Sequence, residues 1–581
     1  MSIDADLAFL SIRLLVELQS PRSPHPMALY EWIVYALLKS PLFHLWQLKQ
    51  SVHRSKKLAL DTIARDLSTH GVELNNDDNV TLESLQLGTD QVSLVVFDDQ
   101  LMTQVLLDSE GADIPRLVKL FQTSLDLAKK AMSPSDGAKV TNFGSEQEKG
   151  PVLNGRPFYN RGPPIAIFHP VSARFLQLIR RDLRELEAHN CIPQTFVNSV
   201  HKFLLVSSKV YKKEHDRRHA LEPILEELLA MDDAVANADR SCSDGQQSFR
   251  AQGQRLVSLL WELKNEIGAG GCCPVVQSSL SYRKYAVNPK RLPLLSISGI
   301  PVFTLAIAGP WLSVGGAFFG AEPMAQQLTD MVYIGFDPLH DDCLLQVANI
   351  LFALKTCCRD LIHYYTTLEP NGHSSSFPRS ACFPSQTSYP CGGNSVEFVY
   401  EDILVNRSAS LKLPAKAVFK AKTTSLSDQR SIVVKFVRRY GGQVHRVLHA
   451  VNLAPELLYD GTDDPNAVDF GGLRMVVMAW VSGTTFGEHR GPKDRLQDLL
   501  NEALKTLGRD GWVHGDLRPP NVLVSSTENL QIIDFDWSGR NGEARYPLTL
   551  NDTLDWANGV RRGGVITHAH DQEMVKKLIS N

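Results

Sequence analysis

The segment Gly511–Gly539, GWVHGDLRPPNVLVSSTENLQIIDFDWSG, decides the fold of the C-terminal part of this chain. Its apolar runs Val522–Val524 and Leu530–Ile533 predict two short strands, and the polar residues between them predict a turn. A hairpin of this kind brings Asn521, which precedes the first strand, beside Asp534, which follows the second. Amide and carboxylate oxygens at neighbouring positions can hold Mg²⁺ on the phosphates of a nucleotide. The segment therefore predicts a divalent-metal site formed by these two side chains.

A third polar residue, Asp516, lies in the loop before the first strand, where its carboxylate is placed to accept the proton of an attacking hydroxyl group. The alternative is an accidental loop with two solvated aspartates, which the spacing and the flanking strands disfavour. The segment resembles the H-x-D-x-x-x-x-N and D-F-G motifs of protein kinases, and both intervals match. The resemblance implies a kinase that uses ATP and Mg²⁺. Asp516 would then be the catalytic residue, and Asn521 and Asp534 the metal ligands.

Residues upstream of the loop agree with this resemblance. Lys435 lies in the apolar run SIVVKF, which resembles the kinase strand whose lysine binds the α- and β-phosphates; the alternative is a lysine at a strand edge that extends to solvent. Val476–Gly483 resembles the hinge strand, where backbone groups from Ala479 to Val481 would meet adenine. Apolar positions over Leu496–Leu507 predict the amphipathic helix before the catalytic loop.

Two expected parts of an ATP site are missing from the sequence. The segment Val405–Leu411, where a glycine-rich loop is expected, contains no glycine. The helix predicted over Gln443–Val451 has no glutamate to pair with Lys435. Gln443 stands near that position, so the ion pair is absent or Glu456 replaces it.

Two further departures indicate a compact kinase. The loop reads HGD rather than HRD, which resembles aminoglycoside and small-molecule kinases and lacks the arginine that senses activation-loop phosphorylation. The metal motif is Asp534-Phe535-Asp536, no A-P-E motif follows, and 47 residues remain after Asp534. Protein Ser/Thr is the expected acceptor, with a small-molecule hydroxyl as the second possibility. A pseudokinase that serves as a binding module is the main alternative.

A second candidate site lies in the middle of the chain. Glu262 and Lys264 form an E-x-K pair at the end of an apolar run, and a strand there would put both on one face. PD-(D/E)XK nucleases resemble this arrangement: their carboxylates hold Mg²⁺ and their lysine steadies the attacking water. Asp244 or Asp239 would supply the partner carboxylate. The alternative is a charged, exposed strand end.

Four other residues fit the nuclease resemblance, which implies a nucleic-acid partner. Gln277 and Tyr282 would form the glutamine-tyrosine helix of RecB-like members. Glu214 and Arg217 are candidates for the leading acidic position of that family.

The chain is predicted to be an α+β multidomain protein. Residues 1–132 are expected to be mainly helical, with Leu7, Leu10, Leu14 and Leu18 at helical spacing, and a strand pair near Val80–Leu101. Residues 165–369 are expected to form an α/β module, restriction-endonuclease-like if the nuclease resemblance holds. Residues 396–581 are expected to form a two-lobed protein-kinase-like domain. The turn-rich segments 133–164 and 370–394 are expected to be linkers.

Composition sets further limits. A net charge of −4 gives no general attraction to nucleic acid or membrane. Nine cysteines without CxxC spacing fit a reduced protein, and the acidic N-terminus does not resemble an export signal. Ile300–Phe319 is uncharged and long enough to cross a bilayer, but its prolines and glycines favour two buried strands. We therefore expect no membrane partner and a location in the cytoplasm or nucleus. A nuclease-like module followed by an HGD kinase resembles fungal Crinkler-related and orphan basidiomycete kinase-like proteins.

Overall fold

The computed structural model describes residues 13–18, 72–73, 92–97, 114–189, 191–231, 243–368, 377, 379–404, 417–425, 429–525 and 529–580. The chain forms two compact units, Met1–Lys119 and Leu120–Asn581, which are described separately. Within the described residues, no helix combines the length and apolar character that crossing a bilayer requires. The eight cysteines in these residues are free thiols.

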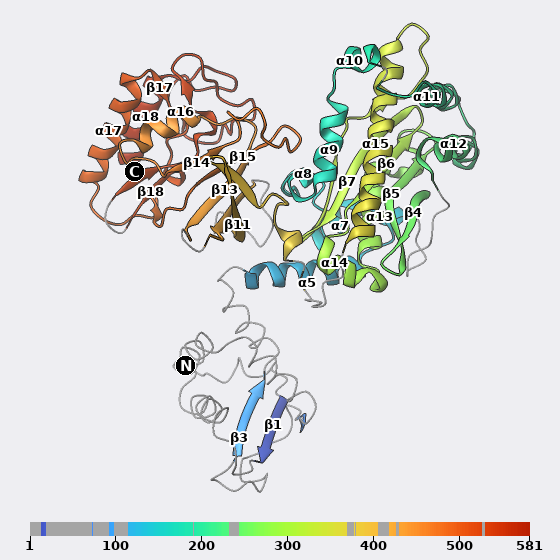
Figure 1. Ribbon diagram of the computed structural model, residues 1–581, viewed down its shortest axis with the longest axis horizontal. Helices are drawn as coiled ribbons and strands as arrows, with labels where there is room; N and C mark the ends of the chain where they lie inside the picture. The colour runs from blue at the N-terminus through green and yellow to red at the C-terminus, as the bar shows by residue number, and fades with distance from the viewer. Residues whose placement is uncertain are drawn as a thin grey trace. The chain divides into compact units, whose positions relative to one another are not determined.

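The first unit contains a small antiparallel sheet (Figure 1). Strand β1 (Arg13–Leu18) lies between β2 (Val72–Glu73) and β3 (Val92–Phe97). The predicted helix through Leu14 and Leu18 is therefore wrong at this point. The sequence VSLVVF of β3 is rich in β-branched residues and pairs with β1 along its full length, and this pairing overrides the helical spacing. The other predicted helical residues before Ile114 lie outside the described residues.

The second unit begins with a mixed sheet. Its strands run in the order β4 (Gly245–Ala251), β5 (Gln254–Lys264), β6 (Val302–Ala308), β7 (Trp311–Phe319) and β8 (Pro323–Gln327), and β9 (Val332–Tyr333) also pairs with β7. Neighbouring strands are antiparallel except β5 and β6, which are parallel and connected through helix α13 (Pro274–Ala286). The predicted pair of buried strands within Ile300–Phe319 is confirmed as β6 and β7. Their tight turn uses Gly309 at φ 54°.

Helices cover both faces of this sheet. Trp261 of β5 and residues of α12 (Glu214–Leu229) line one small cavity, whereas its neighbour Glu262 accepts hydrogen bonds from α13. Because successive strand residues point to opposite faces, α12 and α13 lie on opposite sides. The long helix α15 (Asp341–Thr367) packs against α12 and three further helices (Figure 1). These are α9 (Pro170–Ile179), α10 (Leu183–Ala188) and α11 (Gln194–Ser207). Two shorter helices are α8 (Ile165–Phe168) and α14 (Leu292–Ser298).

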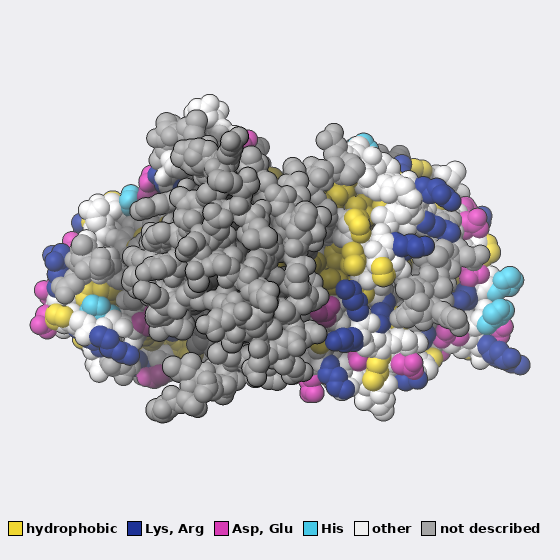
Figure 2. Space-filling view, turned by 90° about the horizontal axis from the view of Figure 1, so that it is seen from below, with side chains coloured by type: hydrophobic (Ala, Val, Ile, Leu, Met, Phe, Trp, Pro, Cys, Tyr) yellow, Lys and Arg dark blue, Asp and Glu magenta, His cyan; other side chains and the backbone are white. Residues whose placement is uncertain are grey.

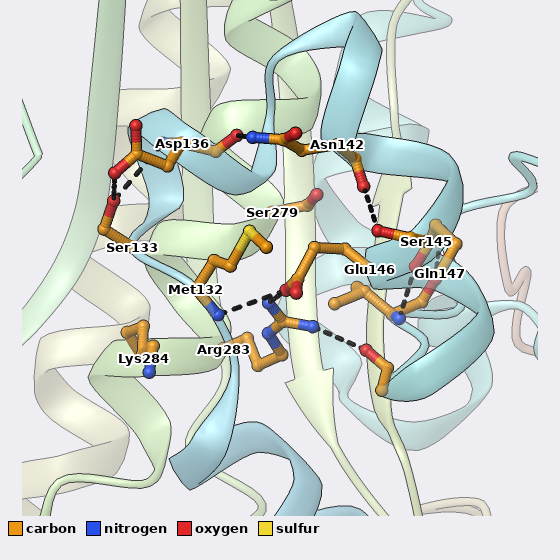
Figure 3. Close-up of polar contacts among 12 residues, drawn as sticks. Met132, Ser133, Asp136, Asn142, Ser145, Glu146, Gln147, Ser279, Arg283 and Lys284 are labelled. Carbon is orange, nitrogen blue, oxygen red and sulfur yellow. Dashed lines mark hydrogen bonds and ion pairs between the residues drawn. The ribbon is translucent and has the colours of Figure 1, made fainter.

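The predicted linker 133–164 is wrong, because much of it is helical and bound to α13. Helix α5 (Ile114–Lys130) precedes α6 (Pro134–Gly137) and α7 (Val140–Lys149). Arg283 of α13 is 0% exposed, and its Nη2 donates to Glu146 Oε2 of α7 at 2.7 Å (Figure 3). The same carboxylate accepts from the backbone N–H of Met132 at 3.3 Å. A buried ion pair thus fixes a segment whose composition is typical of a linker.

The C-terminal region begins with a six-stranded antiparallel sheet. The strand order is β10 (Ser388–Cys391), β11 (Asn394–Ile403), β12 (Val418–Thr423), β13 (Ser431–Val437), β15 (Arg474–Ala479) and β14 (Leu457–Asp460). The second predicted linker, 370–394, therefore contains an edge strand at its end. Strand β13 carries the apolar run around Lys435, as the sequence predicted.

A largely helical part follows. Helices α16 (Gly442–His449), α17 (Asp494–Arg509) and α18 (His568–Ser580) surround a small sheet of β16 (Thr484–Thr485), β18 (Val522–Val524) and β19 (Leu530–Ile532). The predicted hairpin is confirmed by these last two strands. Their inward side chains share one core with residues of all three helices, including Leu448, Leu500, Val522, Ile532, Phe535 and Leu578.

The visible described surface carries both signs of charge. Figure 2 shows Lys and Arg side chains interspersed with Asp and Glu side chains. This mixture agrees with the small net charge of −4, which gives the chain no strong overall field.

Candidate active site

The catalytic loop leaves strand β17 (Trp512–Val513) and ends at a 3-10 turn, Pro519–Asn521. Asp516 is buried in this loop. Asn521 Nδ2 donates to the Asp516 backbone carbonyl at 2.9 Å and to Asp516 Oδ2 at 2.8 Å. The loop thus folds back on itself, and the two residues that the sequence placed at its ends are in direct contact.

Arg518 is a member of the site that the sequence analysis missed. Its Nη2 donates to Asp516 Oδ2 at 2.8 Å, and its Nε contacts Oδ1 of the same carboxylate. The guanidinium also lies over the ring of Trp556, with 5.0 Å to the centroid. Burial raises the pKa of Asp516, and Arg518 opposes this effect. A cation therefore stands next to the proposed position of the reacting hydroxyl group.

The β18–β19 hairpin places Asn521 near Asp534. Val522 pairs with Ile532, and the N–H of Ile533 donates to the carbonyl of Asn521 at 2.9 Å. Asp534 itself has φ 69° and ψ 63°, a left-handed conformation that ends the strand and begins the 3-10 turn Phe535–Trp537. The Asn521 amide nitrogen bonds Asp516, which leaves the amide oxygen as the atom suited to a cation.

Lys435 reaches this turn from strand β13. Its side chain is nearly buried, with 8% of the residue exposed, and its Nζ contacts Asp534 Oδ1. A second carboxylate, Asp536 Oδ1, lies 2.6 Å from the same nitrogen. Burial alone would lower the pKa of Lys435, but the two carboxylates together raise it above its ordinary value. The lysine is therefore a charged partner of the metal motif.

Helix α16 contributes no carboxylate to Lys435. Gln443 is exposed, so it does not occupy the place of the expected glutamate. The alternative that Glu456 replaces that glutamate is wrong, because Glu456 Oε2 pairs with Arg430 Nη1 at 3.0 Å. No ion pair therefore joins Lys435 to α16, which was one of the two alternatives that the sequence left open.

Instead, α16 contributes an aromatic side chain. His445 stacks on Phe535 with ring centroids 4.4 Å apart, and His514 of the catalytic loop meets Phe535 edge-on at 5.0 Å. His445 Nδ1 is 2.8 Å from the hydroxyl of Tyr440. Burial lowers the pKa of both histidines to about 4, so both rings are neutral near pH 7. The stack joins helix, metal motif and catalytic loop.

The catalytic loop is also held from helix α18 by Asp571, another residue that the sequence analysis missed. Asp571 is 1% exposed and accepts the backbone N–H groups of His514 at 2.7 Å and Gly515 at 2.8 Å. Burial raises its pKa to about 6, although both hydrogen bonds favour the ionised form. No local sequence motif identifies Asp571 as part of the site.

The predicted hinge strand is present as β15, whereas its contact with adenine stays a prediction. Ala479 ends β15, but its N–H donates to the carbonyl of Glu456 at 2.9 Å, and the N–H of Trp480 donates to Ser431 at 3.1 Å. Contact with adenine would therefore have to use other backbone groups between Ala479 and Val481. The segment Val405–Leu411 lies outside the described residues.

In the middle module, the E-x-K pair is buried rather than exposed. Glu262 is 0% exposed and accepts from Gln277 Nε2 and Ser281 Oγ, each at 2.6 Å. Burial raises the pKa of Glu262 to about 7. Lys264 Nζ lies 3.4 Å from Glu214 Oε1. These residues come together as predicted, yet as a hydrogen-bonded core cluster.

The remaining nuclease candidates have structural partners. Asp244 Oδ2 accepts the N–H of Leu263 at 2.7 Å, and Oδ1 contacts Arg218. Tyr282 donates to the carbonyl of Ile300 at 3.0 Å, and Arg217 Nη2 pairs with Glu266 at 3.0 Å. Asp239 lies outside the described residues. Over the part of the chain that the structure describes, no three His, Cys, Asp or Glu side chains group in a way that would hold a metal.

A comparison with protein families bears on the C-terminal site. Residues 437–540 match the model of APH, the phosphotransferase enzyme family. The match runs from the end of β13 through the catalytic loop to the end of the metal motif, and it leaves Lys435 just outside. It therefore covers the loop, the hairpin and the aromatic stack described above. This region of the chain is a kinase-like phosphotransferase domain, similar to the APH family.

Proposed function

We propose that the C-terminal region is an ATP- and Mg²⁺-dependent kinase that phosphorylates the hydroxyl groups of protein Ser or Thr residues, with a small-molecule hydroxyl as the second choice of acceptor. One observation carries this proposal. Asp516 and Asn521 contact each other, the hairpin brings Asn521 beside Asp534, and Lys435 from the six-stranded sheet reaches the same Asp534. In this proposal the sheet and the helical part form two lobes with the nucleotide between them.

Each residue has a role that its position supports. Lys435 would bind the phosphates of ATP, because it is a buried ammonium beside the metal motif. Asp516 would orient the acceptor hydroxyl and take up its proton. Arg518, bound to that carboxylate, would neutralise charge that develops on the transferred phosphoryl group. Catalysis would thus rest on positioning and charge neutralisation.

The proposed metal ligands fit Mg²⁺. Asn521 and Asp534 offer hard oxygen atoms, and the cation usually takes one or two such side chains together with substrate phosphates and water. Asn521 and Asp534 would hold Mg²⁺, which when bound would offset the negative charge of the phosphate groups.

Transfer of labelled phosphate tests the proposal. The full chain would be incubated with labelled ATP and Mg²⁺, alone and with a general protein substrate. Asp534→Ala should abolish labelling, because it removes a metal ligand. Asp498→Ala, which changes an exposed aspartate on α17, should label like the wild type. Equal labelling of Asp534→Ala and wild type would overturn the proposal.

A pseudokinase that serves as a binding module is the second candidate. The observation in its favour is that Lys435 and Asp516 already have charged partners in this structure. ATP with Mg²⁺ should raise the melting temperature if the site binds nucleotide. Absence of both labelling and a melting shift would favour the pseudokinase.

The nuclease-like and Crinkler-related assignments stay predictions. The parallel pair β5–β6, connected through α13, supports a nuclease-like fold of the middle module. Lys264→Ala is the variant that tests nuclease activity. Mg²⁺-dependent DNA cleavage that Lys264→Ala loses would support a nuclease. Absence of cleavage with every divalent metal would count against it.

A further inference from the structure

We propose that Asp536 is a positioning residue of the kinase site: it holds Lys435 from within the metal motif and takes the place of the missing helix carboxylate. This inference rests on the proposed function. Its central observation is the 2.6 Å distance between Lys435 Nζ and Asp536 Oδ1. Asp534 contacts the same nitrogen, so Lys435 lies between two carboxylates that are two positions apart in the chain.

Lys435 needs a partner other than Asp534. An ammonium that is nearly buried loses its water and has to be compensated by a nearby anion. Asp534 can compensate it only in part once this carboxylate also coordinates Mg²⁺. A carboxylate that is not required for the metal would keep Lys435 in place while the nucleotide enters and leaves. Asp536 is in position to do this.

Helix α16 supplies no carboxylate to Lys435, and its N-terminus lies close to the metal motif. The N–H of Gly441 donates to the carbonyl of Phe535 at 2.9 Å. A Cβ atom added to Gly441 would lie 2.5 Å from Ser538 Cβ and 3.1 Å from the Phe535 carbonyl oxygen. A side chain at Gly441, the residue before the helix, would therefore collide with the turn. The eight residues of α16, GQVHRVLH, contain no acidic side chain.

The turn also fixes the direction of Asp536. Phe535 is completely buried between His445 and His514. With this ring anchored in the core, the residues on either side of it belong to a rigid turn that begins at the left-handed Asp534. Both carboxylates reach Lys435 from that turn. The metal motif itself thus carries the anchor that a helix would otherwise provide.

This arrangement predicts a specific kinetic effect. Asp536→Asn keeps the shape of the side chain and removes its charge, so Lys435 should bind ATP phosphates less well. A hydrogen bond to a charged group contributes enough for its loss to raise KM for ATP by about tenfold. The value of kcat at saturating ATP should change much less. Glu456→Gln is the matched control, because that carboxylate pairs with Arg430 instead.

The melting temperature of the full chain gives a second test that needs no activity. It would be measured for Asp536→Asn, Lys435→Met and the double variant. If the two residues form a pair, the double variant should lose less than the sum of the single losses. Asp536→Glu, which keeps the charge, should recover most of the KM.

The outcomes are distinguishable. Additive melting shifts together with an unchanged KM would overturn the role of Asp536. Loss of kcat with a higher Mg²⁺ requirement in Asp536→Asn would also overturn it, because Asp536 would then be a metal ligand. If the wild type neither transfers phosphate nor binds ATP, the proposed function fails. Non-additive melting would in that case still support the pairing of Asp536 with Lys435.

Discussion

Replacing Asp571 with asparagine should loosen the catalytic loop while leaving the rest of the domain folded. The carboxylate accepts the N–H groups of His514 and Gly515 at 2.7 and 2.8 Å. An asparagine retains a single oxygen, so its NH₂ group would face one of these N–H donors. An unmade hydrogen bond of a buried backbone donor costs about 1–3 kcal/mol. If a cost of about 2 kcal/mol destabilises only the active conformation of the loop, kcat should decrease by about thirtyfold.

Two measurements check this prediction. Steady-state kinetics should show a lower kcat with little change in KM for ATP, since Asp571 lies on the loop side of the site. Hydrogen exchange should become faster in the backbone from Val513 to Asp516. Glu573→Gln is the control on the same helix, because Glu573 accepts the N–H of Asn558 instead. Unchanged kcat and unchanged exchange in Asp571→Asn would refute the reasoning.

Two predictions concern the stability of the middle module. Burial raises the pKa of Glu262 from 4.5 to about 7 in the folded protein, so the stability that this group contributes below pH 4.5 is lost as the pH rises through 7. Between pH 4.5 and 7 the wild type should therefore lose roughly 3 kcal/mol of unfolding free energy, whereas Glu262→Gln should not. Urea unfolding at several pH values would measure this difference. Parallel pH profiles of the two proteins would contradict the prediction. Glu146→Gln leaves the buried Arg283 without its anion, and should lower the unfolding free energy by about 3–5 kcal/mol. Thermal unfolding would measure this loss, with Glu148→Gln, an exposed change on the same helix, as the control that should unfold like the wild type.

The sequence predicted the parts of the site that depend on local structure. Asn521 and Asp534 flank two apolar runs, and a hairpin of those runs requires that the two residues lie close together. Lys435 is recognisable because its strand has a characteristic apolar pattern. In each case the informative residues lie within one or two elements of each other, so that spacing and hydropathy suffice.

Two residues whose contacts the sequence did not show, Asp571 and Asp536, act over long sequence separations. Asp571 meets a loop more than fifty positions away and lies on a helix without a motif. Asp536 was visible as part of the metal motif, but its bond to Lys435 joins positions 101 residues apart in the chain. The linker prediction failed for a related reason: its polar composition conceals Glu146, whose partner Arg283 lies over a hundred positions further along. Composition does not reveal such tertiary partners.

The position of Asp571 in the chain has a consequence for biosynthesis. During translation, the HGD loop leaves the ribosome well before the helix that carries Asp571. Until that helix emerges and docks, the N–H groups of His514 and Gly515 lack their acceptor. A nascent chain that already displays every recognisable motif would thus be unable to order its loop. The loop would become ordered only when that one helix docks.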